Sequence, residues 1–194
     1  MPVKGQWESR TGMILRCPES FAWAFKPADS PLYGGQARID WLACDHKGRF
    51  WMVEVKQCAL DRKTINVLTD VSPGQRDALT AIAQTEQGIA LLAVGQENIL
   101  YLFDWRTILW RLTQAGGFSE RQRPLLPLSA APIQVLWTGP KAWATNALNL
   151  YAQILWVNSR EPSLPTEPTL IVPASLRTSV TPGKVLSKFR SNSS

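Results

Sequence analysis

Two apolar segments separated by a short polar turn constrain the fold of this chain more than any other feature. One runs through Ile39, Asp40 and Trp41, and the other runs from Trp51 to Gln57. Both are rich in β-branched and aromatic residues, which predicts two strands of a hairpin. Strands this apolar are typical of the centre of a sheet that is covered on both faces. The chain is therefore expected to form an α/β domain rather than an exposed edge hairpin.

Three charged side chains interrupt these apolar strands. Side chains alternate between the faces of a strand, so Glu54 and Lys56 point the same way. A five-residue loop at 45–49 would place Asp40 directly opposite Glu54, with Cβ atoms about 5 Å apart. Two carboxylates at this spacing repel each other unless a cation or a proton lies between them. Hard oxygen ligands suit Mg²⁺ or Mn²⁺, and a lysine can sit beside a metal-bound water, which predicts metal-dependent phosphodiester hydrolysis.

A simpler interpretation of the same residues is a weak ion pair on a solvent-facing hairpin. An acid followed across the turn by Glu-x-Lys is by itself a pattern of low specificity. The apolar neighbours, among them Val53 and Val55, favour a buried site over a surface pair.

At this point the chain resembles the PD-(D/E)XK nuclease superfamily, and within it the RecU-type branch of Holliday junction resolvases. The resemblance spans roughly residues 4 to 112 and rests on five blocks in order. One departure is Ile39, which stands where a proline is common. The blocks are Lys4-Gly5-Gln6-Trp7-Glu8, Gln36 to Asp40, Phe50 to Lys56, Ser72-Pro73-Gly74-Gln75 with Leu79, and Gly88 to Val94.

The resemblance implies a restriction-endonuclease-like central mixed sheet flanked by helices, with a C-terminal extension. It implies that Asp40, Glu54 and the backbone carbonyl of Val55 bind Mg²⁺ (or Mn²⁺), while Lys56 orients the attacking water. It also implies an N-terminal acid in the metal shell, for which Glu8 is the first candidate and Glu19 the other.

Gln75 has two explanations that the sequence leaves open. It stands three residues after Ser72, which predicts a capping box that only holds a helix in place. It is also in line with Leu79 and Ile82 at helical spacing, which predicts that it faces the sheet beside the metal site. In the second case Gln75 joins the catalytic residues.

The remaining pattern predicts the order of the elements. Domain boundaries are expected at 1–115 for the nuclease-like part, 116–158 for an extension that packs on the core or a dimer partner, and 159–194 for a Pro/Ser-rich basic tail, extended for the most part. Predicted helices are 5–16, Ser72 to about Gln87, 105–112 and 140–156; predicted strands are 21–25, 89–94, 98–103 and 133–137; predicted loops are 26–35, 59–70 and 124–132.

The net charge of +6 suggests a polyanionic partner. Residues 1–115 carry 13 basic and 12 acidic side chains, whereas residues 116–194 carry 8 and 3. Within the first part, several basic residues flank the predicted site and are candidate DNA contacts: Lys4, Arg10, Lys26, Arg38, Lys47, Arg49, Arg62 and Lys63.

The cysteines and the histidine argue against several kinds of site and suggest a cellular location. Cys17, Cys44 and Cys58 lack the spacing of a disulfide framework or a zinc site, so we expect free buried thiols and a cytoplasmic location. His46 is the single histidine and falls in the predicted turn, which argues against histidine-based catalysis. No apolar run is long enough to span a membrane, so a membrane partner is not expected.

The expected function is an Mg²⁺-dependent endodeoxyribonuclease that acts in DNA recombination and repair, on branched DNA such as Holliday junctions. Paired cuts on a two-fold symmetric junction imply a homodimer, for which the stretches 105–110 and 143–156 offer aromatic surface. The alternatives are a DNA-binding or assembly protein that keeps the fold without turnover, and a structural protein with a plain ion pair.

Overall fold

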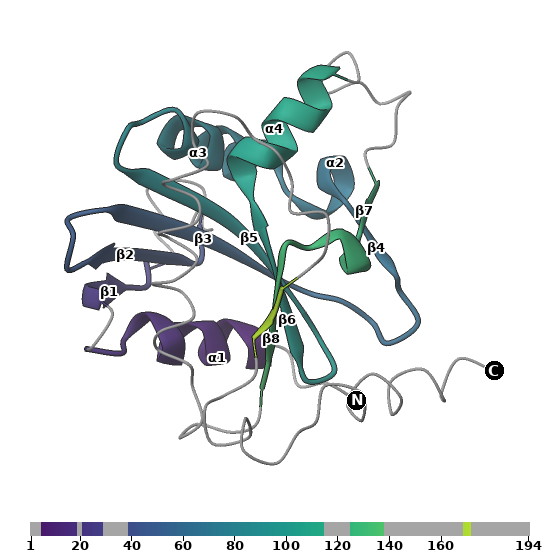
Figure 1. The fold of residues 1–194 in the computed structure, drawn as a ribbon, viewed down its shortest axis with the longest axis horizontal. Coiled ribbons are helices and arrows are strands. Elements are labelled where there is room, and N and C mark those ends of the chain that lie inside the picture. The colour runs from purple at the N-terminus through teal and green to yellow at the C-terminus, as the bar shows by residue number, and fades with distance from the viewer. Residues whose placement is uncertain (1–4, 19–20, 29–38, 115–124, 138–168, 172–194) are drawn as a thin grey trace.

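The structure, a computed structural model, describes residues 5–18, 21–28, 39–114, 125–137 and 169–171. A mixed sheet with the strand order β1-β2-β3-β5-β6-β8 forms its centre, and β9 adjoins β8 at the edge (Figure 1). Within the six strands, β3 and β5 form the parallel pair and all other neighbours are antiparallel. The α/β class and the mixed sheet flanked by helices are thus confirmed.

The elements follow one another with short connections. The strands of the large sheet are β1 (Phe21–Phe25), β2 (Trp41–Asp45), β3 (Phe50–Gln57), β5 (Gly88–Gln96), β6 (Ile99–Asp104), β8 (Ile133–Leu136) and β9 (Thr169–Ile171). A second sheet contains β4 (Thr64–Asn66) and β7 (Leu125–Pro127). The helices are α1 (Gln6–Leu15), α2 (Val67–Asp70), α3 (Pro73–Ala83), α4 (Trp105–Gln114) and the short 3-10 helix η2 (Leu128–Ala130).

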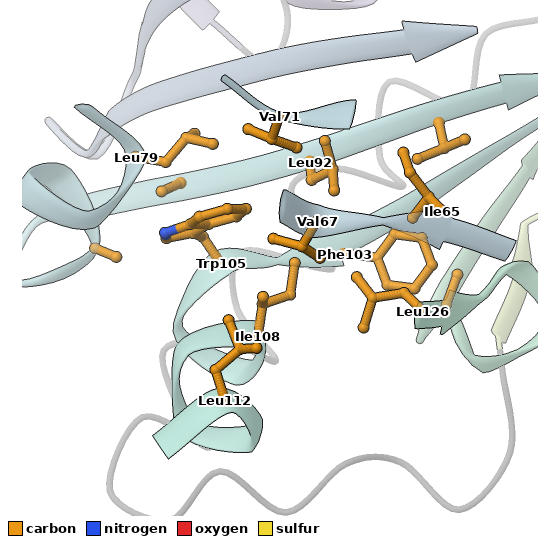
Figure 2. Close-up of a cluster of buried hydrophobic side chains, with 14 of the residues drawn as sticks. Ile65, Val67, Val71, Leu79, Leu92, Phe103, Trp105, Ile108, Leu112 and Leu126 are labelled. Atoms are coloured by element: carbon orange, nitrogen blue, oxygen red, sulfur yellow. The ribbon is translucent and has the colours of Figure 1, made fainter. Parts of the chain in front are cut away.

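Two apolar cores lie on opposite faces of the large sheet. On one face α1 packs against the sheet, where a Cβ on Gly12 would overlap the ring of Trp41 and one on Gly95 would overlap Trp7. On the other face α2, α3 and α4 cover the sheet together with the small sheet β4–β7, around Leu92 and Trp105 (Figure 2). Strand β5 is buried along nearly its whole length, as expected of a strand with helices on both faces.

The hairpin of β2 and β3 has the predicted register. Trp41 pairs with Val53 and Cys44 with Phe50, which leaves residues 45–49 as the connection. Continued by one residue, this register places Asp40 level with Glu54. Strand β3 lies between β2 and β5, so both strands are interior to the sheet.

Three local predictions were wrong. The helix expected to reach Gln87 ends at Ala83, because the guanidinium of Arg106 donates to the carbonyls of Ala83, Thr85 and Gly88. The loop expected at 59–70 contains β4 and α2, and the connector expected at 124–132 contains β7 and η2. These short elements form because Ile65 and Leu126 are buried together in the core beneath α4.

The structure describes only part of the C-terminal segment. Strands β7 and β8 belong to the segment 116–158 and pair with β4 and β6. The helix expected at 140–156 lies outside the described residues, and so does the tail 159–194 except for Thr169–Ile171. Among the described residues, no helix is long and apolar enough to cross a membrane.

Candidate active site

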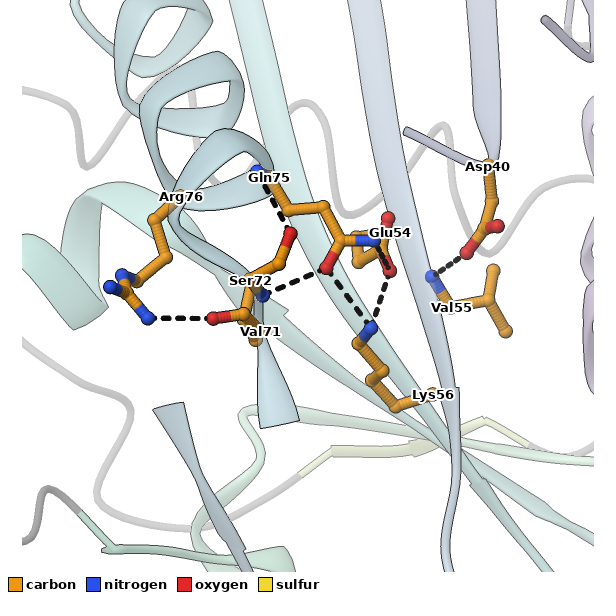
Figure 3. Close-up of polar contacts among 8 residues, drawn as sticks. All are labelled: Asp40, Glu54, Val55, Lys56, Val71, Ser72, Gln75 and Arg76. Atoms are coloured by element: carbon orange, nitrogen blue, oxygen red, sulfur yellow. Dashed lines mark hydrogen bonds and ion pairs between the residues drawn. The ribbon is translucent and has the colours of Figure 1, made fainter. Parts of the chain in front are cut away.

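Glu54 is the centre of a polar cluster on the α3 side of the sheet (Figure 3). It alternates with Val53 and Val55, which pack into the core on the α1 side, so its own side chain points toward α3. Only 1% of Glu54 is exposed. The interpretation as a solvent-facing surface pair is therefore wrong.

One oxygen of Glu54 accepts from both of the side chains that contact this carboxylate. Lys56 Nζ lies 2.7 Å from Glu54 Oε1, and Gln75 Nε2 donates to the same oxygen at 2.6 Å. Glu54 Oε2 is buried and has no hydrogen-bond partner among the described residues. A buried carboxylate oxygen without a donor is costly, so this atom marks a position where a ligand would be stabilising.

Asp40 lies just before β2 and bonds to the backbone of the neighbouring strand. Its Oδ2 accepts the N–H of Val55 at 2.7 Å. Burial raises the pKa of Asp40, the hydrogen bond from Val55 lowers it, and the charge of Glu8 raises it. The net direction is upward, with burial as the largest cause.

The pKa of Glu54 is raised to about 7, first by burial and next by the charge of Asp40. The charge and hydrogen bond of Lys56 act in the opposite direction without offsetting the rise. The charge of Asp40 thus raises the cost of ionising Glu54, as expected for two carboxylates across a hairpin.

Gln75 forms the predicted capping box and also faces the sheet, while its catalytic role stays a prediction. Ser72 Oγ accepts the N–H of Gln75 and Gln75 Oε1 accepts the N–H of Ser72, which is a complete capping box. The same Oε1 accepts from Lys56 Nζ at 3.1 Å. The amide therefore caps α3 and contacts the Glu54–Lys56 pair at once.

Glu8, on α1, lies close enough to Asp40 for its charge to raise the Asp40 pKa. Its carboxylate forms an ion pair with Lys26, and its carbonyl accepts the indole N–H of Trp41 at 3.1 Å. The structure thus brings Glu8 beside Asp40, whereas Glu19 lies outside the described residues. A role for Glu8 as a metal ligand stays a prediction.

The donor set fits Mg²⁺ in chemistry but is sparse. Within the described residues, no group of three or more His, Cys, Asp or Glu side chains is arranged to hold a metal ion. Asp40 and Glu54 supply two hard carboxylates, and Glu54 Oε2 is a buried oxygen that lacks a donor. Mg²⁺ commonly keeps several waters and takes one or two carboxylates, so two acids and a backbone carbonyl suffice.

The candidate DNA contacts separate into different environments. Arg49 differs most from its prediction, because it is buried and its Nε bonds to Asp45 at 2.6 Å. Arg10 lies between the rings of Trp7 and Trp137, which ties α1 to the end of β8. Of the others, Lys26 pairs with Glu8, Arg62 pairs with Asp70, Lys47 and Lys63 are exposed, and Lys4 and Arg38 lie outside the described residues.

Arg76, which lies near the cluster, was not identified from the sequence. Arg76 Nη1 donates to the carbonyls of Leu68 and Val71, which fixes the turn that leads into α3. Cys17, Cys44 and Cys58 form no disulfide among the described residues, and Cys58 is buried as expected whereas the other two are half-buried. His46 is exposed, and its Nε2 contacts the carbonyl of Pro18.

No protein-family model matches the chain, and no curated protein matches its sequence.

Proposed function

We propose that this protein is an Mg²⁺-dependent endonuclease of the PD-(D/E)XK type that hydrolyses DNA phosphodiester bonds. The observation that carries the proposal is the buried Glu54. Its Oε1 is held by Lys56 and Gln75, its Oε2 lacks a partner among the described residues, and Asp40 lies beside it. Two acids lie beside one lysine here, and a bound cation would offset the remaining negative charge and give Glu54 Oε2 a partner.

Asp40, Glu54 and the carbonyl of Val55 would hold the metal ion. When bound, Mg²⁺ supplies polarisation of the scissile phosphate and a lower pKa for a bound water. Lys56 Nζ holds a positive charge at the same place and would stabilise the negative charge that develops on the phosphoryl oxygens. Gln75 hydrogen-bonds to both the Lys56 ammonium and the Glu54 carboxylate, which limits the positions that both can take.

The second candidate is a DNA-binding or assembly protein that keeps this fold without turnover. One feature favours it: Glu54 Oε1 has two donors from the protein itself, Lys56 and Gln75. The Glu54–Lys56 pair is therefore neutral without a metal. The two functions differ in one property, because the enzyme requires Mg²⁺ at Asp40 and Glu54 and the binding protein does not.

Branched DNA as substrate and a homodimer as the active form follow from the resemblance to RecU-type resolvases, together with the symmetry of a four-way junction. The stretch 105–110 supports a dimer surface less than the sequence suggested. Trp105 is fully buried, with its indole N–H donated to Thr80 at 2.9 Å, whereas Trp110 is exposed. Of this stretch, the outer face of α4 at Trp110 is thus the part that a partner subunit can reach.

A cleavage assay tests the proposal. Four-way junctions, nicked duplex, flaps and linear duplex are incubated with the wild-type chain, with and without Mg²⁺. We expect Mg²⁺-dependent cuts near the branch point of the junction. Asp40→Asn should lose at least about 100-fold in rate while it binds DNA as tightly or more tightly, since it repels phosphate less.

Asp61→Asn is the matched control, because Asp61 is an exposed acid in the β3–β4 connection and should keep the wild-type rate. An Asp40→Asn protein that cuts as fast as the wild type would refute the proposal. Equal cleavage of linear duplex by a monomer would remove only the preference for junctions.

A further inference from the structure

The start of α3 is joined to the Glu54–Lys56 pair through a single amide group (Figure 3). Gln75 Oε1 accepts two hydrogen bonds, from Ser72 N at 2.9 Å and from Lys56 Nζ at 3.1 Å. Gln75 Nε2 donates to Glu54 Oε1 at 2.6 Å. One side chain therefore connects the helix cap with both members of the ion pair.

The neighbours leave this amide one favourable orientation. An ammonium and a backbone N–H are donors only, so the oxygen of Gln75 must face Ser72 and Lys56. The nitrogen then faces Glu54, whose carboxylate accepts from it. Rotation of the amide by 180° would set its nitrogen against two donors, the Lys56 ammonium and the Ser72 N–H, and lose both hydrogen bonds.

Ser72 is itself fixed by the surrounding chain. Val71 is fully buried in the core on the α3 side, and its carbonyl accepts from Arg76 Nη1 at 2.7 Å. The same Nη1 donates to the carbonyl of Leu68 at 2.8 Å, so the turn between α2 and α3 is held from within the helix. The N–H of Ser72 is thus a donor in a set position.

From these contacts we infer that the backbone N–H of Ser72 is a positioning group for the site: it fixes the amide of Gln75 and, through it, the directions of Glu54 and Lys56. Ser72 does not touch the reacting atoms and is not a catalytic residue. Groups that orient a metal ligand from behind commonly change metal affinity about 10- to 100-fold when they are removed. The consequence for metal binding rests on the proposed function, whereas the orientation of Gln75 does not.

Two substitutions at position 72 separate the N–H from the side chain. Ser72→Ala removes Oγ and keeps the N–H. Ser72→Pro removes both and places a ring carbon where the hydrogen was, so Gln75 Oε1 must move away. Proline fits the backbone here, because Ser72 has φ −62° and Val71 is extended with φ −114° and ψ 115°.

The first measurement needs no metal: the exchange rate of the Gln75 side-chain amide hydrogens, followed by NMR. We expect similar protection in the wild type and in Ser72→Ala, and exchange at least about tenfold faster in Ser72→Pro. The second is the Mg²⁺ dissociation constant by calorimetry with the metal alone. It should rise less than about threefold in Ser72→Ala and about tenfold or more in Ser72→Pro.

Asn66→Ala provides a control for the loss of a helix cap as such. Asn66 caps α2, since its Oδ1 accepts the N–H of Leu68 at 3.0 Å, and its own N–H donates to Asp70, which lies outside the site. It should lower the melting temperature and leave both the amide exchange and the Mg²⁺ affinity near wild type.

Protection of the Gln75 amide and Mg²⁺ affinity that are both unchanged in a folded Ser72→Pro protein would overturn the inference. A wild-type chain that binds no Mg²⁺ would refute the proposed function instead. The amide exchange would then decide alone whether Ser72 positions Gln75.

Discussion

The β2–β3 hairpin carries two buried carboxylates that have opposite surroundings. Asp45 lies at the turn and Glu54 in the middle of β3, with 2% and 1% of their surfaces exposed. Asp45 accepts hydrogen bonds from the N–H groups of Lys47 and Arg49, from Arg49 Nε and from the indole of Trp51. Both of its oxygens therefore have partners, whereas Glu54 Oε2 has none among the described residues.

The pKa values of the two acids move in opposite directions as a result. Burial acts to raise the pKa of Asp45, but the hydrogen bonds from Trp51 and Arg49 outweigh it, and the pKa falls. Burial raises the pKa of Glu54 to about 7, and the charge of Asp40 adds to it. Asp45 and Glu54 are thus equally buried but differ in their donors. Asp45 has enough hydrogen-bond donors to form a purely structural cluster, whereas Glu54 has too few and can accept a ligand.

The largest expected difference between the two acids is in cleavage. Glu54→Gln should reduce Mg²⁺-dependent cleavage about 1000-fold, because it removes a metal ligand and the partner of Lys56. Asp45→Asn should cut within about tenfold of wild type when assayed below its melting temperature. Cleavage rates on a four-way junction at saturating Mg²⁺ check both variants. Equal losses of rate would show that the different surroundings of Asp45 and Glu54 do not matter for cleavage.

The next effect concerns stability and should fall on Asp45. Asp45→Asn weakens a buried, fully paired cluster, so we expect a loss of about 3–4 kcal/mol in the free energy of unfolding at pH 7. A folded pKa below the unfolded value means that this contribution is present above about pH 4 and is lost as the pH falls through the folded pKa. Urea denaturation across pH 2–7 measures it, and a loss below about 0.5 kcal/mol would contradict the closed cluster.

Glu54 should show the opposite dependence on pH. Its folded pKa of about 7 lies above the unfolded value of 4.5, so the folded state binds the proton more tightly. Stability should therefore be highest below pH 4.5, fall by about 2–3 kcal/mol as the pH rises to 7, and stay level above it. In urea denaturation, Glu54→Gln should make the free energy of unfolding nearly independent of pH between 4.5 and 7. If the dependence on pH is unchanged, another group is responsible for it.

The smallest effect is stabilisation by the metal. Mg²⁺ at ten times its dissociation constant should raise the free energy of unfolding by about 1.4 kcal/mol at pH 8, where Glu54 is ionised. The same increase is expected in Asp45→Asn, and none in Glu54→Gln. Thermal melting with and without EDTA measures it, and an equal shift in Glu54→Gln would place the metal elsewhere.

The sequence predicted the large sheet well because its signals are local. The alternation in β3 and the turn residues gave the hairpin register, and Ser72 with Pro73 gave the start of α3. The ion pair of Glu54 and Lys56 follows from their spacing in one strand.

What the sequence could not predict depends on contacts between distant segments. The end of α3 is set by Arg106 from α4, and the burial of Arg49 is set by its bond to Asp45. Gln75 both caps α3 and contacts Glu54 on β3. The second contact depends on how close α3 lies to β3, which no local sequence pattern indicates. The capping box was the only available signal for Ser72, and it gave no reason to connect it with the site.

The parallel pairing of β3 with β5 has a consequence for how the protein folds. Phe50 pairs with Gly88 and Gln57 with Gly95, so each contact joins residues 38 positions apart. Closing such a loop costs entropy before any contact repays it, and non-local pairing of this kind slows folding. Gln75 lies within that loop. The hairpin can bring Asp40 and Glu54 together early, whereas the contact of Gln75 with Glu54 joins residues 21 positions apart and is expected to form later.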